Sequence, residues 1–412
     1  MSSEERRAFG GRIAHLREQR GFTQKELAAE IGRTASWLSQ VERGVQPVNR
    51  IDVLRMLANG LGVSVQEIRP DAPAERIAVE RTAPERSNDL DQARLLISGH
   101  PVPEVLLGPT GAGTSASVDQ LSVAVDHVWE LTHANRFAEL SAELGPLVPR
   151  IERAMRTAAA DQRPALASLL ARTYQALAAA FVRQGEADAA WVAADRAIRS
   201  AEECGQPLEV FAGVFRLSQA FVRLKRFDQA EHGATTALNA LERYAADRDE
   251  PEAHSVTGAL FLALALAHAR AGERAKARAA LDEAKRVADR LGEDRNDYNL
   301  EFGPTNVEIQ AVSLAVELGD AGEAIDRGTR IDASELSNER RARLLMDLGR
   351  AYTQRKQFGE AQAALLQAEE LSPELIRTHL AARETIRDLT LAAGRSAGPD
   401  LRGLASRADA QP

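Results

Sequence analysis

The most regular pattern of apolar and polar positions near the start of the chain spans residues 23–44, TQKELAAEIGRTASWLSQVERG. Apolar residues recur at helical spacing in two short blocks, which predicts two short helices joined by a tight turn. The first helix begins with a capping box, because Thr23 and Glu26 stand three residues apart. Gly32 follows this helix and is expected to end it, since glycine is a poor helix former.

The second helix of this pair is expected to start after Thr34, whose hydroxyl suits an N-cap. Leu38 and Val41 share one face and are predicted to be buried. The opposite edge is small and polar, and it comprises Ala35, Ser36, Ser39 and Gln40. A short helix with such an outer edge can lie in the major groove of DNA. Apolar positions before and after the pair complete a unit of five small helices within residues 4–69.

From Val118 onward, the sequence reads as a series of paired amphipathic helices. Five pairs align on a small residue near the start of the second helix: Ala190, Ala230, Ala277, Ala324 and Ala361. A sixth, degenerate pair is expected near residues 119–155. Stacked pairs of this kind bury a continuous core and form one concave face. The pattern therefore predicts an α-solenoid over residues 119–394.

The segments outside these two regions are rich in Pro, Gly and Ser. Residues 71–118 are predicted to be a linker with one short helix at 88–99, and residues 395–412 are predicted to be a disordered tail. The string GPTGAGTS at 108–115 has the spacing of a phosphate-binding loop, but Thr114 stands where that motif needs lysine. We therefore interpret it as part of the linker.

Composition and charge agree with a soluble protein of the cytoplasm. Cys204 is the single cysteine, so an intramolecular disulfide framework is excluded. No signal peptide is recognised, and no apolar run long enough to span a membrane is expected. Residues 1–70 contain eleven Lys and Arg against eight Asp and Glu, whereas the whole chain has a net charge of −8. A basic head on an acidic body is the charge division expected of a DNA-binding protein.

The string GFTQKELAAEIG followed by WLSQVERG resembles the phage-repressor-like helix-turn-helix of the xenobiotic-response-element family. That resemblance implies a five-helix lambda-repressor-like fold over residues 1–70 and direct contact with double-stranded DNA. It assigns phosphate, base-edge or packing roles at the DNA face to Gln24, Thr34, Ala35, Ser36, Trp37, Ser39, Gln40, Arg43, Asn49 and Arg50. Relatives often carry glutamine or arginine where this chain has Ala35, which cannot make a bidentate hydrogen bond to a base. Gln40 is therefore the best candidate for base readout.

The last helix pair, LLMDLGRAYTQRKQFGEAQAALLQAEELSP, resembles a tetratricopeptide repeat. Gly349 and Ala361 are small where its two helices are expected to cross closely. The repeat spacings of 37 to 47 residues exceed the ~34 of that family, so longer helices and loops are expected. The fold class predicted for the whole chain is all-α, with a tetratricopeptide-like solenoid after the DNA-binding head.

A phage-repressor-like head followed by tetratricopeptide repeats resembles bacterial transcriptional regulators, including those that sense signalling peptides. That resemblance implies a homodimer whose repeats bind a peptide, small-molecule or protein effector. Extrapolated repeat geometry, together with a polar and aromatic interruption at residues 296–310, predicts a ligand groove formed by Arg172, Gln175, Phe215, Gln219, Asn299, Phe302, Asn306, Ser313 and Arg350. The start of the helix after Gly303 is a further candidate for receiving an anion or a peptide carbonyl.

Other chemistry has little support in the sequence. His127 and His133 flank Trp129 at helical spacing, but no third ligand stands at metal-site spacing. No GxSxG or HExxH motif is present. We therefore expect no metal, no cofactor, no membrane partner and no enzymatic activity. The alternative to a sequence-specific regulator is a protein-interaction scaffold or anti-regulator with weak or non-specific DNA binding, which Ala35 and the modest basic charge of the head favour slightly.

Overall fold

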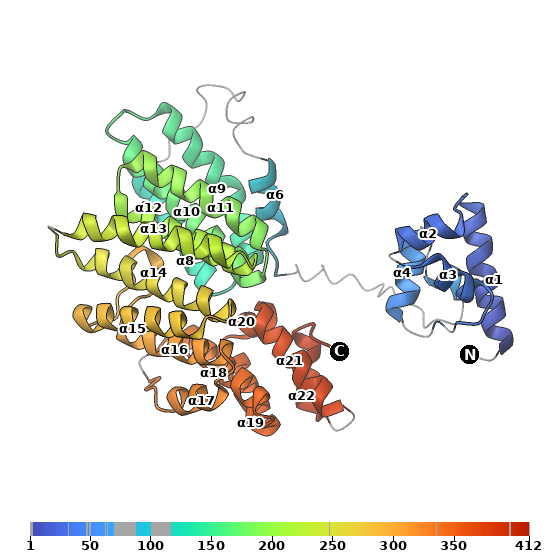
Figure 1. The fold of residues 1–412 in the computed structure, drawn as a ribbon. Helices are drawn as coiled ribbons and strands as arrows, with labels where there is room; N and C mark the ends of the chain where they lie inside the picture. The colour runs from blue at the N-terminus through green and yellow to red at the C-terminus, as the bar shows by residue number, and fades with distance from the viewer. Residues whose placement is uncertain are drawn as a thin grey trace. The chain divides into compact units, whose positions relative to one another are not determined.

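A computed structural model describes residues 3–31, 33–46, 48, 51–61, 63, 65–69, 88–99, 117–246, 248–334, 336–394 and 397–411. The chain divides into two compact units, Met1–Glu85 and Arg86–Pro412. Within the described residues there is no β-strand, and one isolated bridge joins Arg295 to Phe302. The predicted all-α fold class is confirmed (Figure 1).

The first unit contains five helices in its described part: α1 (Ser3–Gln19), α2 (Gln24–Glu30), α3 (Ala35–Glu42), α4 (Ile51–Leu61) and α5 (Val65–Ile68). The predicted capping box forms at the start of α2, because the Thr23 amide donates to Glu26 and the Glu26 amide donates to Thr23 Oγ1. Leu27, Leu38 and Leu57 are fully buried in one core. Burial of this shared apolar core holds the short helices together, since helices of this length are marginal alone.

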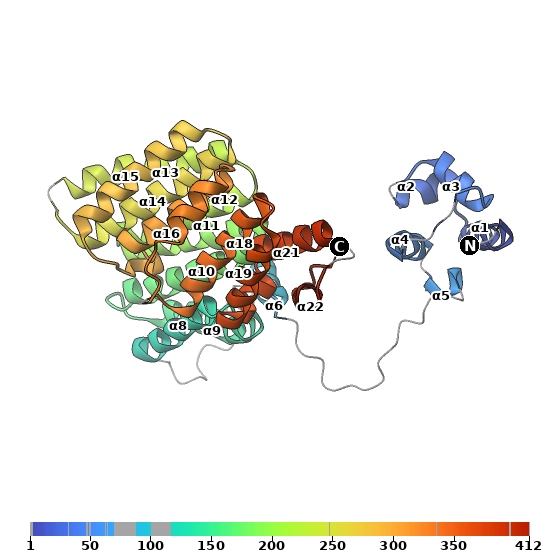
Figure 2. The same ribbon diagram turned by 90° about the horizontal axis from the view of Figure 1, so that it is seen from below.

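The second unit consists of helices that pack largely as antiparallel pairs (Figure 2). They are α6 (Asp91–Gly99), α8 (Val118–His133), α9 (Phe137–Thr157), α10 (Arg163–Gln184), α11 (Ala187–Cys204), α12 (Pro207–Arg223), α13 (Phe227–Ala245), α14 (Pro251–Arg270), α15 (Arg274–Leu291), the 3-10 turn η1 (Asp297–Asn299), α16 (Pro304–Glu317), α17 (Ala321–Gly328), α18 (Asn338–Gln354), α19 (Phe358–Leu371), α20 (Pro373–Thr378), α21 (Leu380–Ala393) and α22 (Pro399–Arg407).

Small residues set the close crossings within the pairs. Each of the five aligned alanines is the fourth residue of its helix and is essentially fully buried: Ala190, Ala230, Ala277, Ala324 and Ala361. A Cβ added at Gly349 would lie 2.9 Å from the Leu365 side chain across the last pair. A larger residue there would push α18 and α19 apart, as the sequence pattern predicted.

Two segments expected to lack tertiary structure are packed onto the solenoid. Helix α6 forms within the predicted linker, but it buries Ala93 and Ile97, and Arg196 donates to the Ile97 carbonyl at 2.6 Å. The predicted disordered tail contains α22, so that prediction is wrong. Its apolar residues recur at helical spacing and are buried against α21, and Arg407 Nε donates to Glu369 at 2.7 Å. The amphipathic pattern of α22 was missed in the sequence because Gly, Ser and Pro residues surround it. The glycine-rich string at 108–115 lies outside the described residues.

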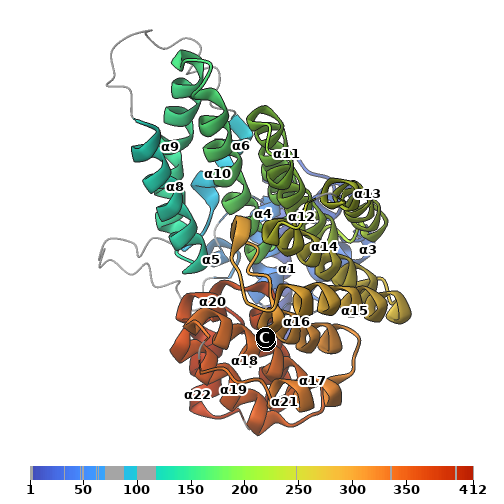
Figure 3. The same ribbon diagram turned by 90° about the vertical axis from the view of Figure 1, so that its left-hand side faces the viewer.

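The first and last parts of the solenoid contact each other (Figure 3). Arg183, near the end of α10, lies 3.3 Å from Glu339 at the start of α18. Asn88 donates to Glu374 of α20, and the Leu380 side chain of α21 packs against Gly185. These contacts connect repeats that are far apart in sequence, so the superhelix closes on itself and its concave face becomes the wall of a cavity.

Helix α10 is long and apolar enough to cross a bilayer by length and composition, contrary to the expectation that no such run exists. Most of its apolar window, 78%, is buried inside the protein. Leu177, Ala178 and Phe181 are fully buried between α8, α11 and α12. A core helix of a solenoid has this composition because both of its faces are covered.

Candidate DNA-binding helix and solenoid cavity

Helix α3 presents the small polar edge that the sequence predicted. Thr34 has extended backbone angles, and its hydroxyl accepts from the Trp37 amide at 3.2 Å, so it is the N-cap. Leu38 and Val41 are fully buried beneath the helix. On the outer side, Thr34, Ala35 and Ser36 are exposed, and Ser39 and Gln40 are half-buried.

A buried carboxylate anchors the C-terminal end of α3 to the rest of the head. Glu42 accepts from Arg17 Nε of α1 at 2.6 Å and from Gln24 Nε2 of α2 at 2.6 Å. The side chains of Arg17 and Glu42 are only 9% and 6% exposed. The hydrogen bond to Glu42 raises the pKa of Arg17 despite its burial. Sequence reasoning missed this network because its three members lie on three helices with no common spacing.

The side-chain amide of Gln24 therefore donates to Glu42 of α3 within the protein. The phosphate contact predicted for Gln24 stays a prediction. Trp37 is half-buried against the head core, and the Arg33 guanidinium lies 5.4 Å from the centre of its ring. Trp37 thus packs partly against the core, and its predicted role at the DNA face stays a prediction. Arg43 is exposed, and its Nε donates to the Ser39 carbonyl. Asn49 and Arg50 lie outside the described residues.

The solenoid encloses a cavity of about 220 Å³. Its wall includes six residues of the predicted groove, namely Phe215, Gln219, Asn299, Asn306, Ser313 and Arg350. The other three lie elsewhere. Arg172 donates to Asp126 at 2.6 Å away from the cavity, Gln175 is buried among the helices, and Phe302 is fully buried. The groove prediction is wrong for these three, because repeat position alone does not give the rotation of each helix or the path of the insertion.

The insertion before α16 explains the burial of Phe302. Its ring packs against Gly258 of α14, where an added Cβ would overlap the ring. Three residues of the insertion, Tyr298, Asn299 and Glu301, have positive φ. Asp294 Oδ1 accepts from the Thr305 amide at 3.0 Å. The start of α16 thus already holds a carboxylate, so the prediction that it receives an external anion is not supported.

Arginines dominate the charge of the cavity wall. Among the residues that the structure describes, its lining includes Arg183, Arg216, Arg223, Arg270, Arg343 and Arg350, against the carboxylates of Glu301, Glu317 and Asp347. Of these arginines, the groove prediction contained Arg350 alone. The others could not be found from repeat spacing, since arginine is the commonest cationic residue of this chain and occurs along all of its length.

Two of the lining carboxylates are neutralised by close arginines. Arg350 lies 2.8 Å from Glu317 and 2.9 Å from Asp347, and Arg270 lies 3.2 Å from Glu317. Burial opposes ionisation of Glu317, but Arg350 and Arg270 outweigh it and lower its pKa. At Asp347 the burial dominates and raises the pKa.

Two lining arginines on α12 have no such partner. Within the described part of the chain, no carboxylate lies within 4.0 Å of Arg216 or Arg223. Arg216 is 6% exposed; it donates to the Asn299 carbonyl at 2.7 Å, while its buried Nε has no acceptor. Burial lowers the pKa of Arg216 to about 9 and that of Arg223 to about 10. Neighbouring arginines add to both effects.

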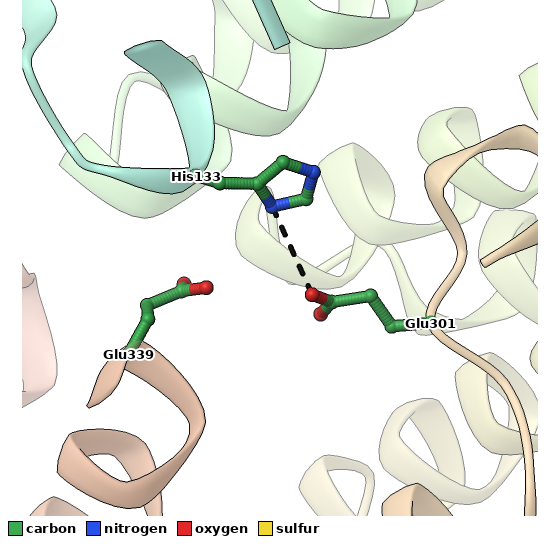
Figure 4. A group of neighbouring side chains, drawn as sticks. All are labelled: His133, Glu301 and Glu339. Atoms are coloured by element: carbon green, nitrogen blue, oxygen red, sulfur yellow. Dashed lines mark ion pairs between the residues drawn. The ribbon is translucent and has the colours of Figure 1, made fainter. Parts of the chain in front are cut away.

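One cluster at the cavity wall has the residue types of a metal site. His133, Glu301 and Glu339 point toward one another, with their potential ligand atoms within 4.8 Å (Figure 4). However, Arg343 and Arg183 already lie 2.8 and 3.3 Å from Glu339. Burial by itself raises the pKa of Glu339, but the positive charges of these arginines outweigh burial and lower that pKa. A cation would have to displace two guanidinium groups, so we interpret the cluster as a salt-bridge network that closes the superhelix.

Comparison with known proteins supports both parts of this description. A helix-turn-helix domain model matches residues 8–70, and a tetratricopeptide repeat model matches residues 342–375. Among proteins with curated functions, none matches the sequence. The crystal structure of Bacillus thuringiensis PlcR in complex with the peptide PapR7 and DNA is similar with a TM-score of 0.37 and 12% identity, over 89% of this chain and 94% of that one. The chain therefore carries a helix-turn-helix domain at its N-terminal end and a tetratricopeptide repeat near its C-terminal end.

Proposed function

We propose that this protein is a sequence-specific, DNA-binding transcriptional regulator of the cytoplasm whose solenoid senses an effector. The observation that carries the proposal is the geometry of α3 within the helix-turn-helix domain. Its inner edge is buried and its N-terminal edge is exposed and small, so it can enter a major groove. Glu42 fixes its far end to α1 and α2 through hydrogen bonds.

The proposal assigns different roles to the residues of this face. Gln40 contacts a base edge, because its amide offers a donor and an acceptor in one plane. Thr34, Ser36 and Ser39 contact base edges or the adjoining backbone, and Ala35 meets a thymine methyl group. Arg43 contacts phosphate, as do Asn49 and Arg50 beyond it. Phosphate contacts set position and affinity, whereas base contacts set sequence preference.

We further propose that the protein binds DNA as a homodimer. One head of this size covers too little DNA for tight and selective binding. Heads that pair directly would read half-sites about one helical turn apart. The cavity of the solenoid is then the site where an effector changes the affinity for DNA.

A comparison of Gln40→Ala with Arg43→Ala tests these roles. Binding of each variant is measured on a selected site and on random DNA over a range of salt concentrations. Gln40→Ala is expected to weaken specific binding by about 1–3 kcal/mol with a much smaller loss on random DNA. Arg43→Ala is expected to weaken binding to both and to flatten the salt dependence. Equal losses on both DNAs for Gln40→Ala would refute its assignment to base readout.

A further inference from the structure

The wall of the solenoid cavity is divided into three stripes of different chemistry. Helix α12 contributes Arg216, Gln219 and Arg223, which are spaced three and four residues apart and therefore share one face. Helix α14 contributes the small and apolar Ala259, Leu262, Ala263 and Leu266. Helix α16 contributes Asn306, Gln310 and Ser313, and its last residue, Glu317, is paired with Arg270 at the end of α14 and with Arg350. Since α14 packs against both α12 and α16, the apolar stripe lies between a cationic stripe and a polar stripe.

The cationic stripe carries positive charge that no carboxylate of the described residues pairs with at contact distance, although Glu301 acts on Arg216, and Glu317 and Glu384 act on Arg223, from farther away. Arg216 and Arg223 lack the carboxylate partners that Arg270, Arg343 and Arg350 have. Arg216 is held in place by the Asn299 carbonyl and lies 5.4 Å from the centre of the Trp129 ring. A buried and incompletely paired guanidinium reduces stability unless an anion accompanies it. This cost suggests that the arginines are retained for binding.

The polar stripe offers hydrogen-bonding groups to a ligand. Asn306 and Gln310 carry side-chain amides, line the cavity and are half-buried. Their donors and acceptors face the same cavity as the arginines. A ligand that fills the space therefore meets cations on one side, hydrogen-bonding amides on the other and an apolar floor between them.

We propose that the solenoid cavity binds a small organic anion, with a carboxylate or phosphate group paired to Arg216 and Arg223 and an apolar body over α14. Guanidinium groups match both oxyanions in geometry. The cavity volume of about 220 Å³ suits a small ligand, since pockets for drug-sized molecules are typically about 300–1,000 Å³. An effect of this ligand on DNA binding rests on the proposed function. Binding of the anion to the cavity does not depend on that function.

Thermal unfolding of the full-length protein tests the proposal with defined probes. Hexanoate supplies a carboxylate on an apolar body, 1-hexanol supplies the same body without charge, and inorganic phosphate supplies an anion without the body. We expect hexanoate to raise the melting temperature of the solenoid in a saturable manner. Neither 1-hexanol nor sodium chloride at equal ionic strength should do so. A saturable rise with phosphate alone would overturn the role of the apolar floor, and no saturable rise with any probe would overturn the proposal.

Three arginine variants distinguish a binding role from a structural one. Arg223→Met should abolish the hexanoate shift and, by removing an uncompensated charge, raise the melting temperature without ligand. Arg350→Met should instead lower the ligand-free melting temperature, because Glu317 and Asp347 lose their partner. Arg199→Met removes an exposed arginine of α11 and should change neither quantity. A hexanoate shift that survives Arg223→Met would contradict the assigned site.

DNA binding is measured on the same samples, so that the two proposals fail separately. A hexanoate shift without preferential DNA binding would retain the anion site and refute the regulatory function. Preferential DNA binding without any ligand-induced shift would retain the function and refute the anion site.

Discussion

Replacing Glu42 by alanine is expected to destabilise the DNA-binding head more than any exposed charge change. Glu42 accepts from Arg17 Nε at 2.6 Å, from Arg17 Nη2 at 3.2 Å and from Gln24 Nε2 at 2.6 Å. Its removal leaves the Arg17 guanidinium buried with Glu18 as its remaining carboxylate neighbour, 3.3 Å away. Breaking a buried pair in this way typically costs about 3–5 kcal/mol. That is a large share of the ~5–15 kcal/mol that stabilises a domain.

Hydrogen exchange of backbone amides measures this cost within the full-length protein, because it reports local stability. We expect protection in α2 and α3 to fall by roughly 10²- to 4 × 10³-fold in Glu42→Ala, since ~1.4 kcal/mol corresponds to a factor of ten. Protection in the solenoid should not change. DNA binding should fall in parallel, because α3 loses its anchor.

Glu18→Ala is the matched control, because Glu18 contacts the same arginine but its side chain is 68% exposed. An exposed pair contributes about 0–1 kcal/mol, so protection in the head should hardly change. The double variant Arg17→Met with Glu42→Leu should recover much of the lost protection, since it removes both buried charges. If Glu42→Ala and Glu18→Ala have equal effects, the anchoring role of the network is refuted.

Three further predictions concern the solenoid. Gly258→Ala should destabilise the solenoid by about 1–3 kcal/mol in denaturant unfolding, because the new methyl group overlaps the Phe302 ring. Gly233→Ala, at an open helical position of α13, should be neutral or stabilising. Equal effects of the two variants would contradict the close packing of Phe302 on Gly258. The free energy of unfolding should decrease as the pH falls below 4.5, the ordinary pKa of glutamate, because the lowered pKa of Glu317 stabilises the folded state above that pH and this gain is lost as Glu317 is protonated. A Glu317→Gln variant should flatten this part of the pH profile. An unchanged profile would exclude Glu317 as a source of the pH dependence. Deleting residues 397–411 should lower the melting temperature by exposing the core that α22 covers, whereas no change is the result expected of a disordered tail.

The local elements of this protein were predictable because their signals are short-range. Thr23 and Glu26 form the capping box that their spacing indicates, and Thr34 caps α3. The aligned alanines mark the second helix of each pair because close helix crossings exclude larger side chains. These rules require three or four residues of context, which the sequence supplies directly.

The cavity was predicted incompletely because it depends on contacts between distant repeats. Arg183 meets Glu339 across the closed superhelix, and no periodicity of one helix reveals that pairing. Phe302 was expected to contact a ligand, yet its ring packs against Gly258 of α14, where the missing side chain leaves room for it. The charge of the cavity wall likewise emerges from α10, α12, α14 and α18 together.

The most direct test of the account is preferential DNA binding by the purified full-length protein. A fluorescent fragment from upstream of its own gene is titrated at about physiological salt, with a scrambled fragment of the same composition as competitor. The account predicts binding to the upstream fragment that survives excess scrambled competitor and that Gln40→Ala reduces. Equal binding to both fragments would contradict a sequence-specific regulator and favour a scaffold whose head has lost DNA specificity.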